Sequence, residues 1–380
     1  MYTSGFLDVD SLKEIDKSEA AAKSGFDDLV IPEAYRDLLI SVIESHKSGS
    51  IPGGMQTQSK MFTQMDIVQG KGRGLIILLH GPPGVGKTST AETIAAYSRR
   101  PLYPLTSGDI GLTSGQIEDN LGYHFSLASQ WGCIMLIDEA DVFLMKRDWQ
   151  DIRRNALVSG RPESSAFHTI IPADPLVFLR VLEYYSGILF LTTNRTGVID
   201  EAFKSRMHLY LRYPSINLDS TKIIWGKQLD RITRYNKDSD VKIEFERSTL
   251  ISYAVEHYQE HEEKKTTWNA RQIRNAFQTA VAMGQYDRVR LLADNDMTDE
   301  QAKERGGPYM RVKLSKENLV KIATTTNDFD SFMMSVRGGT DGHRAREEGL
   351  RDDEFEPDRP AATKQYSGLS VLTARSQSRI

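Results

Sequence analysis

The sequence predicts an α/β protein in which a parallel sheet flanked by helices is followed by a small all-helical domain. Short apolar runs bounded by turn residues recur at Leu75–Leu79, Cys133–Ile137 and Gly187–Leu191. Helix-like stretches separate these runs, and that alternation is typical of a parallel sheet covered by helices. The apolar runs stop after Pro214, and amphipathic stretches of helical period follow.

The composition narrows the possible classes of protein. A chain of 380 residues provides for about two domains, and 48 Lys+Arg against 52 Asp+Glu give a formal net charge of −4. This balance gives no overall reason to bind nucleic acid or an anionic membrane. The single cysteine, Cys133, excludes an internal disulfide framework, and the longest apolar runs are far shorter than a membrane helix needs. Because the acidic N-terminus has no apolar signal core, we expect an intracellular, cytoplasmic protein.

These shifts in composition divide the chain into four segments. Residues 1–25 are polar without sustained periodicity and are expected to form a flexible lead-in. The α/β domain is predicted over 26–214 and the helical domain over 215–338. Residues 339–380 mix charges of both signs with scattered Gly and Pro, so a disordered tail is expected there.

A phosphate-binding loop follows the first apolar run. The motif G-x-x-x-x-G-K-[ST], which marks P-loop NTPases, is matched in full by Gly81, Pro82, Pro83, Gly84, Val85, Gly86, Lys87 and Thr88. It follows LIILLH and opens a helix-like stretch that includes Ser89. The glycines let backbone N–H groups and a helix N-terminus face a β-phosphate. Lys87 adds a charge near the β- and γ-phosphates, and the Thr88 hydroxyl can ligate Mg²⁺.

Two carboxylates end the second apolar run. Asp138 and Glu139 follow CIMLI, and the carboxyl ends of parallel strands are where such sheets bind ligands. We expect Asp138 to hold Mg²⁺ through water and Glu139 to orient the water that attacks the γ-phosphate.

The same stretch spells Asp-Glu-Ala-Asp over 138–141, which is the signature of DEAD-box helicases. Those helicases carry a second strand-rich domain and a Ser-Ala-Thr motif. Here the third apolar run ends in Thr192-Thr193-Asn194, and helical patterns follow. No basic stretch interleaved with aromatic residues offers a path for single-stranded nucleic acid, so the helicase interpretation is disfavoured.

Four motifs follow one another along the chain: GPPGVGKT, the run into Asp138-Glu139, LFLTTN and IDEAFKSR. In this order they resemble a AAA+ ATPase module. The chain is similar to the classical AAA branch and, within it, to fungal AAA-domain proteins, with Gly70–Ile76 in place of their GKGKGLI. The similarity covers about 26–335 and implies Mg²⁺-dependent hydrolysis of ATP to ADP, a hexameric ring and the remodelling of a protein partner. Such relatives usually carry a long domain before the module, so a short form or a truncated gene model is expected.

The resemblance also assigns roles by position. Asn194 resembles sensor 1, which helps to place the attacking water, and Arg206 resembles the arginine finger that one subunit offers to its neighbour's nucleotide. Arg271 resembles sensor 2 in the lid, while Asp66 and Ile67 lie where relatives contact adenine. Each has a plainer alternative: Asn194 as the start of a turn, and Arg206 and Arg271 as surface arginines.

Two departures from the family pattern keep a second function open. Ser205 stands where many relatives have the first of two arginines, and Thr113-Ser114-Gly115 occupies the pore-loop position without an aromatic residue. Both favour a regulatory or scaffold protein that binds ATP but hardly hydrolyses it. The intact Glu139 favours a hydrolase.

Residues Gly160–Leu176 interrupt a predicted helix with three prolines. Deleting these 17 residues joins RRNALVS to VFLRVLEYY and places Leu157, Phe178, Val181, Leu182 and Tyr185 on one stripe. We hypothesise a retained intron, and a natural surface insertion is the alternative.

The histidines show no ligand spacing. His257 and His261 are four residues apart, but they lie in the charged stretch HYQEHEEKK. We expect them on a solvated helix face, and no histidine metal site is predicted.

Overall fold

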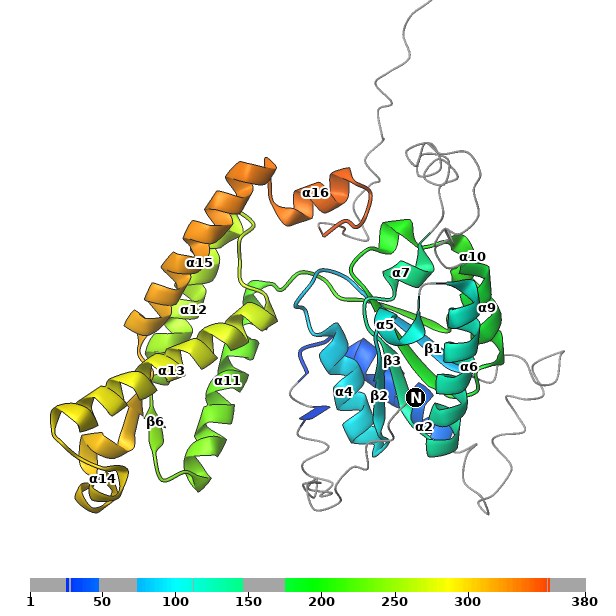
Figure 1. Cartoon of the computed structure of the whole chain (residues 1–380). Coiled ribbons are helices and arrows are strands. Elements are labelled where there is room, and N and C mark those ends of the chain that lie inside the picture. Colours follow the sequence, from blue (N-terminus) through cyan, green and yellow to red (C-terminus); the bar gives the residue numbers. More distant parts are fainter. Residues whose placement is uncertain are drawn as a thin grey trace, which may run out of the picture.

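The computed structural model describes residues 25–26, 29–47, 74–111, 113–145, 175–353 and 355. Figure 1 shows an α/β core and a helical lid joined near residues 213–217. The predictions for Asp66, Ile67, residues 1–24 and most of Gly160–Leu176 lie outside the described residues. Within the described ranges, none of the helices combines the length and the apolar character that crossing a membrane requires.

The core contains a five-stranded parallel sheet, as the sequence predicts. Its order is β2-β3-β4-β1-β5, with all neighbours parallel. The strands are β1 (Leu75–His80), β2 (Leu102–Leu105), β3 (Ile134–Ile137), β4 (Ile188–Thr193) and β5 (Leu209–Arg212). Because β4 lies between β3 and β1, the segments that follow these three strands meet at one edge of the sheet.

Helices cover both faces of this sheet. The core helices are α2 (Glu33–Lys47), α4 (Lys87–Ser98), α5 (Ser107–Ile110), α6 (Ser114–Trp131), α7 (Asp141–Leu144), α9 (Pro175–Tyr184) and α10 (Glu201–Lys204). Alternate residues of β1 point to opposite faces: Ile77 joins the apolar cluster under α2 and α4, whereas Ile76 and Leu78 join the cluster under α6 and α9. Burial on both faces explains the continuous apolar runs.

Helix α9 carries three of the five residues of the predicted stripe, Tyr185 follows it directly, and Leu157 lies outside the described residues. Phe178, Leu182 and Tyr185 are buried, and Val181 packs against the same cluster. The helix begins at Pro175, since proline suits the first turn of a helix. Pro175 and Leu176 of the hypothesised intron are therefore helical, and sequencing the transcript across codons 159–177 tests that hypothesis.

The lid is helical, as predicted. It consists of α11 (Leu218–Asp238), α12 (Arg247–Glu262), α13 (Ala270–Asp294), α14 (Asp299–Arg305) and α15 (Lys316–Arg337). Trp225 is its central side chain and contacts Phe277 edge-on at 4.9 Å between ring centroids. Sequence analysis missed one feature: β6 (Lys242–Glu244) pairs in parallel with β7 (Arg311–Lys313). Strands of three residues are too short to show an alternating pattern.

The prediction that His257 and His261 lie on a solvated face of their helix, α12, is wrong. His257 and His261 are 5% and 8% exposed, and their rings stack at 4.2 Å. His257 also lies 4.3 Å from the Trp268 ring. Burial, together with the charge of His261, lowers the pKa of His257 to about 4. The charged neighbours in sequence lie on the opposite side of the helix, because α12 packs against α11 and α15.

Residues 339–353 differ from the expected disordered tail, and the rest of that prediction, apart from Phe355, lies outside the described residues. Helix α15 ends at left-handed Gly338, and α16 (Asp341–Glu347) follows with Thr340 as its N-cap. The chain then returns to the core, where the Gly197 N–H donates to the Leu350 carbonyl at 2.7 Å. We call residues 341–353 and 355 the C-terminal segment. Figure 1 shows α16 between the tops of the lid and the core.

Candidate functional site

Three groups of predicted site residues come together at the carboxyl edge of the sheet. The phosphate-binding loop follows β1, Asp138 and Glu139 follow β3, and Asn194 follows β4. The sheet order makes these three strands neighbours, so segments more than a hundred positions apart in the sequence form one site.

The loop between β1 and α4 needs its glycines. Gly81, Gly84 and Gly86 have φ angles of +144°, +75° and +104°, which residues with a Cβ rarely adopt. A Cβ on Gly81 would also collide with the Tyr213 carbonyl. Helix α4 has no side-chain cap and no acidic residue in its first turn, so its N–H groups can receive an anion. Ser89 is exposed in that turn.

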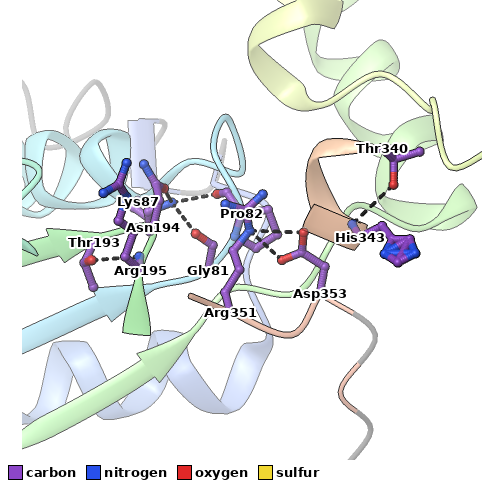
Figure 2. Close-up of polar contacts among 10 residues, drawn as sticks. All are labelled: Gly81, Pro82, Lys87, Thr193, Asn194, Arg195, Thr340, His343, Arg351 and Asp353. Carbon is purple, nitrogen blue, oxygen red and sulfur yellow. Dashed lines mark hydrogen bonds and ion pairs between the residues drawn. The ribbon is translucent and has the colours of Figure 1, made fainter. Parts of the chain in front are cut away.

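Lys87 is buried at the centre of the site. Its ammonium donates to the carbonyls of Gly81 and Pro82 at 3.0 and 2.6 Å, and to Asn194 Oδ1 at 2.7 Å (Figure 2). Burial lowers the pKa of Lys87 to about 8, against the opposing charge of Asp138. The charges of Arg351 and Arg271 lower this pKa further, so these cations lie within electrostatic range of Lys87.

Asp138 and Thr88 form the candidate metal site. The Thr88 hydroxyl donates to the two Asp138 carboxylate oxygens at 3.1 and 3.2 Å. Mg²⁺ prefers oxygen ligands and often takes one or two from protein and the rest from water and phosphates, so this pair fits it. Groups of three or more His, Cys, Asp or Glu side chains suited to a metal do not occur in the described part of the chain.

Sequence analysis missed Thr192, which supports both acids. Its hydroxyl donates to Asp138 and accepts from the Glu139 N–H at 3.1 Å. Glu139 has a φ of +53°, which is uncommon for a residue with a side chain, and this hydrogen bond helps to hold it. Glu139 is exposed to solvent. The sequence signal that could have identified Thr192 is its hydroxyl-bearing side chain within an otherwise largely apolar strand.

Arg206 is held within its own subunit. Its guanidinium donates to Glu183 on α9 at 3.0 and 2.7 Å and to the Ala202 carbonyl at 2.8 Å. These contacts do not bring it to the phosphate-binding loop of its own chain. The arginine-finger role toward a neighbouring subunit therefore stays a prediction.

The lid touches the phosphate-binding loop through the start of α13. Asn269 caps this helix by accepting from the Gln272 N–H at 3.0 Å. A Cβ on Gly84 would lie 2.5 Å from Asn269 Cγ, so the glycine permits close contact with the lid. Arg271 is exposed in the first turn of α13.

A cavity of about 250 Å³ opens where three parts of the chain meet. Its lining includes Pro82, Pro83 and Val85 from the loop, Trp268 and Gln272 from the lid, and Arg337, Arg351 and Asp353 from the end of the chain.

Comparisons with known families match both parts of the chain. Residues 77–215 match the family model of the ATPase family associated with various cellular activities, AAA. Residues 216–340 match that of the fungal AAA+ ATPase lid domain.

Curated proteins are similar over a shorter stretch. The ATPase family AAA domain-containing protein 3A homolog of Drosophila melanogaster is 36% identical over 84 residues, which is 22% of this chain and 14% of that protein. The human ATPase family AAA domain-containing protein 3C is 37% identical over 86 residues, 22% of this chain and 21% of that protein. The similarity therefore spans about a fifth or less of these relatives.

Proposed function

Because this chain belongs to the AAA ATPase family and carries a fungal AAA+ lid domain, we propose that it binds Mg²⁺ and ATP between core and lid and hydrolyses the ATP. Lid movement coupled to this reaction then remodels a protein partner. The observation that carries the proposal is the contact of Lys87 with Asn194 beside the Thr88–Asp138 pair.

Binding rests on the phosphate-binding loop. The uncapped first turn of α4 and the Lys87 ammonium offer donors to the phosphates. Lys87 is held by carbonyls and by Asn194, and phosphate oxygens can replace these acceptors. The adenine contacts of Asp66 and Ile67, and a lid contact from Arg271, belong to the proposal.

Hydrolysis rests on Glu139. Thr88 and Asp138 would hold Mg²⁺, which supplies charge neutralisation on the phosphates. Glu139 positions a water for attack on the γ-phosphorus. As the bond between the γ-phosphorus and the β–γ bridging oxygen breaks, the proton of that water passes to solvent or phosphate. Asn194 accepts from Lys87 at the same edge of the sheet and can orient that water.

The wider biology remains part of the proposal. A homohexameric ring, with Arg206 facing the neighbour's nucleotide, and an unidentified protein substrate rest on family membership. A cytoplasmic location rests on the single cysteine, Cys133, which is buried and unpaired.

Two substitutions test the proposal with purified protein. Glu139→Gln should lower ATP turnover by about a hundredfold or more and leave ATP binding intact, because only the positioning of water is lost. Lys87→Ala should abolish measurable binding. Glu92→Gln, an exposed acid on α4, is the matched control and should behave as wild type. A wild type that binds no ATP would overturn the proposal.

One observation favours a second function. Arg206 is engaged by Glu183 inside its own subunit, which favours an ATP-binding scaffold with little turnover. Wild-type turnover no faster than that of Glu139→Gln, with ATP still bound, would support the scaffold.

A further inference from the structure

The C-terminal segment forms part of the nucleotide cleft. Its backbone joins the loop after β4 through the Gly197–Leu350 hydrogen bond of 2.7 Å. A Cβ on Gly197 would collide with the Gly349 carbonyl, so the two backbones are in direct contact. Farther along, the Arg212 guanidinium lies 4.8 Å from the centre of the Phe355 ring. These contacts place Arg351 between two points fixed to the core.

Figure 2 shows Arg351 beside the Gly81–Pro82 turn. Its side chain is 14% exposed, and it lines the same cavity as Pro82. A second, half-buried cation beside a phosphate-binding loop raises the local positive potential and so favours an anion.

Among the described residues, the Arg351 guanidinium pairs with Asp353, which accepts from its Nε at 3.0 and 3.1 Å. Those bonds use a single N–H of the guanidinium. The remaining N–H groups can bind phosphate oxygens in the bidentate geometry that arginine favours. Asp353 holds the side chain in place and also competes with a phosphate for it.

We propose that Arg351 is a phosphate-contacting residue of the nucleotide site, supplied in cis by the C-terminal segment. The inference rests on the proposed function, since it assigns a further residue to the same site. It also gives the site an arginine from its own chain, whereas Arg206 is bound to Glu183. The ligand class is a nucleoside di- or triphosphate.

The test is nucleotide affinity, measured by titration of full-length protein with a fluorescent ADP analogue and by competition with ATP. Arg351→Ala should weaken binding about tenfold, the usual effect of losing a charge-assisted hydrogen bond. Asp353→Asn should tighten binding about threefold, because a weak competing ion pair is removed. Arg344→Ala is the matched control: Arg344 lies on α16, pairs with Glu348 at 3.2 Å and should leave affinity unchanged.

The opposite signs separate ligand contact from a structural role. If the ion pair only holds the segment in place, both substitutions weaken binding or neither does, and either result overturns the inference. If Lys87→Ala weakens binding while Arg351→Ala binds as wild type, the inference fails and the proposed function stands. If the wild type binds no nucleotide, the proposed function fails and the inference with it.

A second variant tests the placement of the segment. Gly197→Ala introduces the Cβ that collides with Gly349 and should displace Arg351 without altering it. Its affinity should fall about tenfold, and Arg351→Ala should then add less than about twofold. A full tenfold loss from Arg351→Ala in the Gly197→Ala background would contradict the placement.

Discussion

The two walls of the cleft are built differently. On the core wall, side chains hold one another: Lys87 donates to Asn194, and Asp138 accepts from both Thr88 and Thr192. On the lid wall, Arg271 is exposed, and Arg351, on the C-terminal segment that is anchored to the core, is held by a residue two positions away. The core wall is therefore ordered before a ligand arrives, whereas Arg271 and Arg351 can respond to one.

Each wall also depends on its own apolar core. The core wall rests on strands such as β1 and β4, which are buried on both faces. The lid wall rests on a cluster of aromatic side chains around Trp225. If the α/β core and the lid fold independently, a substitution in the apolar cluster of one should leave the cleft wall of the other intact.

Trp225→Ala should have the largest effect, a loss of about 3–5 kcal/mol in the stability of the lid, because it leaves a cavity in a close-packed cluster. Trp225 is 1% exposed and contacts Tyr253, Trp268 and Phe277. Hydrogen exchange measured by mass spectrometry should show lost protection in α11–α15 and unchanged protection in the sheet.

Tyr235→Ala is the control on the same helix, since Tyr235 is 53% exposed; it should change stability by less than about 0.5 kcal/mol. Equal loss of protection in β1 and β4 in the Trp225→Ala protein would show that the two units do not unfold independently.

The next effect concerns pH. The folded-state pKa of His257 is about 4, below its ordinary value of 6.5, so the unfolded chain binds more protons between these values. Stability therefore falls as pH drops from 6.5 to 4, by up to about 3 kcal/mol for this group. His257→Phe should reduce this loss, because phenylalanine does not bind a proton. The substitution breaks no hydrogen bond of Nε2, which is buried without a partner in the described part of the chain.

His80, at the end of β1, provides an internal comparison for this experiment. Burial, with the charges of Arg212 and Lys87, also lowers the pKa of His80 to about 4, so the sheet keeps its pH dependence in the His257→Phe protein. Chemical unfolding at pH 4.5 and pH 7 measures the difference. An unchanged dependence in the variant would contradict the assignment to His257.

A third, smaller effect concerns the core wall. Thr192→Val keeps the shape of the side chain but removes the hydroxyl that bonds Asp138 and the Glu139 N–H. The activation free energy of ATP hydrolysis should rise by about 2 kcal/mol, which lowers turnover roughly thirtyfold. The affinity for ATP should change little. Steady-state hydrolysis assays measure this.

Thr193→Val is the neighbouring control, because the Thr193 hydroxyl bonds Asp141 and the Arg195 N–H instead. If both variants lose turnover equally, the role assigned to Thr192 is wrong.

The smallest expected effect measures the contact between the walls. Gly84→Ala and Gly86→Ala both place a side chain at positive φ, but only the first would collide with Asn269. In nucleotide-free protein, Gly84→Ala should lose about 1 kcal/mol more unfolding free energy than Gly86→Ala. Equal losses would mean that the lid does not press on the loop.

Local patterns in the sequence were sufficient for most of the core wall, although not for Thr192. The glycine spacing around Lys87 and the apolar run into Asp138 each identify a strand, a turn and a chemical group within about ten residues. The lid and the C-terminal segment have no such local pattern. Arg351 is one charge in a polar stretch, and His257 lies among charged residues that conceal a buried helix face.

The sequence by itself determined the alternation of strands and helices, the phosphate-binding loop and the acids that follow β3, because each is encoded by neighbours along the chain. Only the tertiary structure decided that Thr192 supports both acids, that Arg206 pairs with Glu183 and that Arg351 reaches the loop near Lys87. These contacts join residues far apart in sequence, and they form only when packing of the apolar faces fixes where each strand and helix lies.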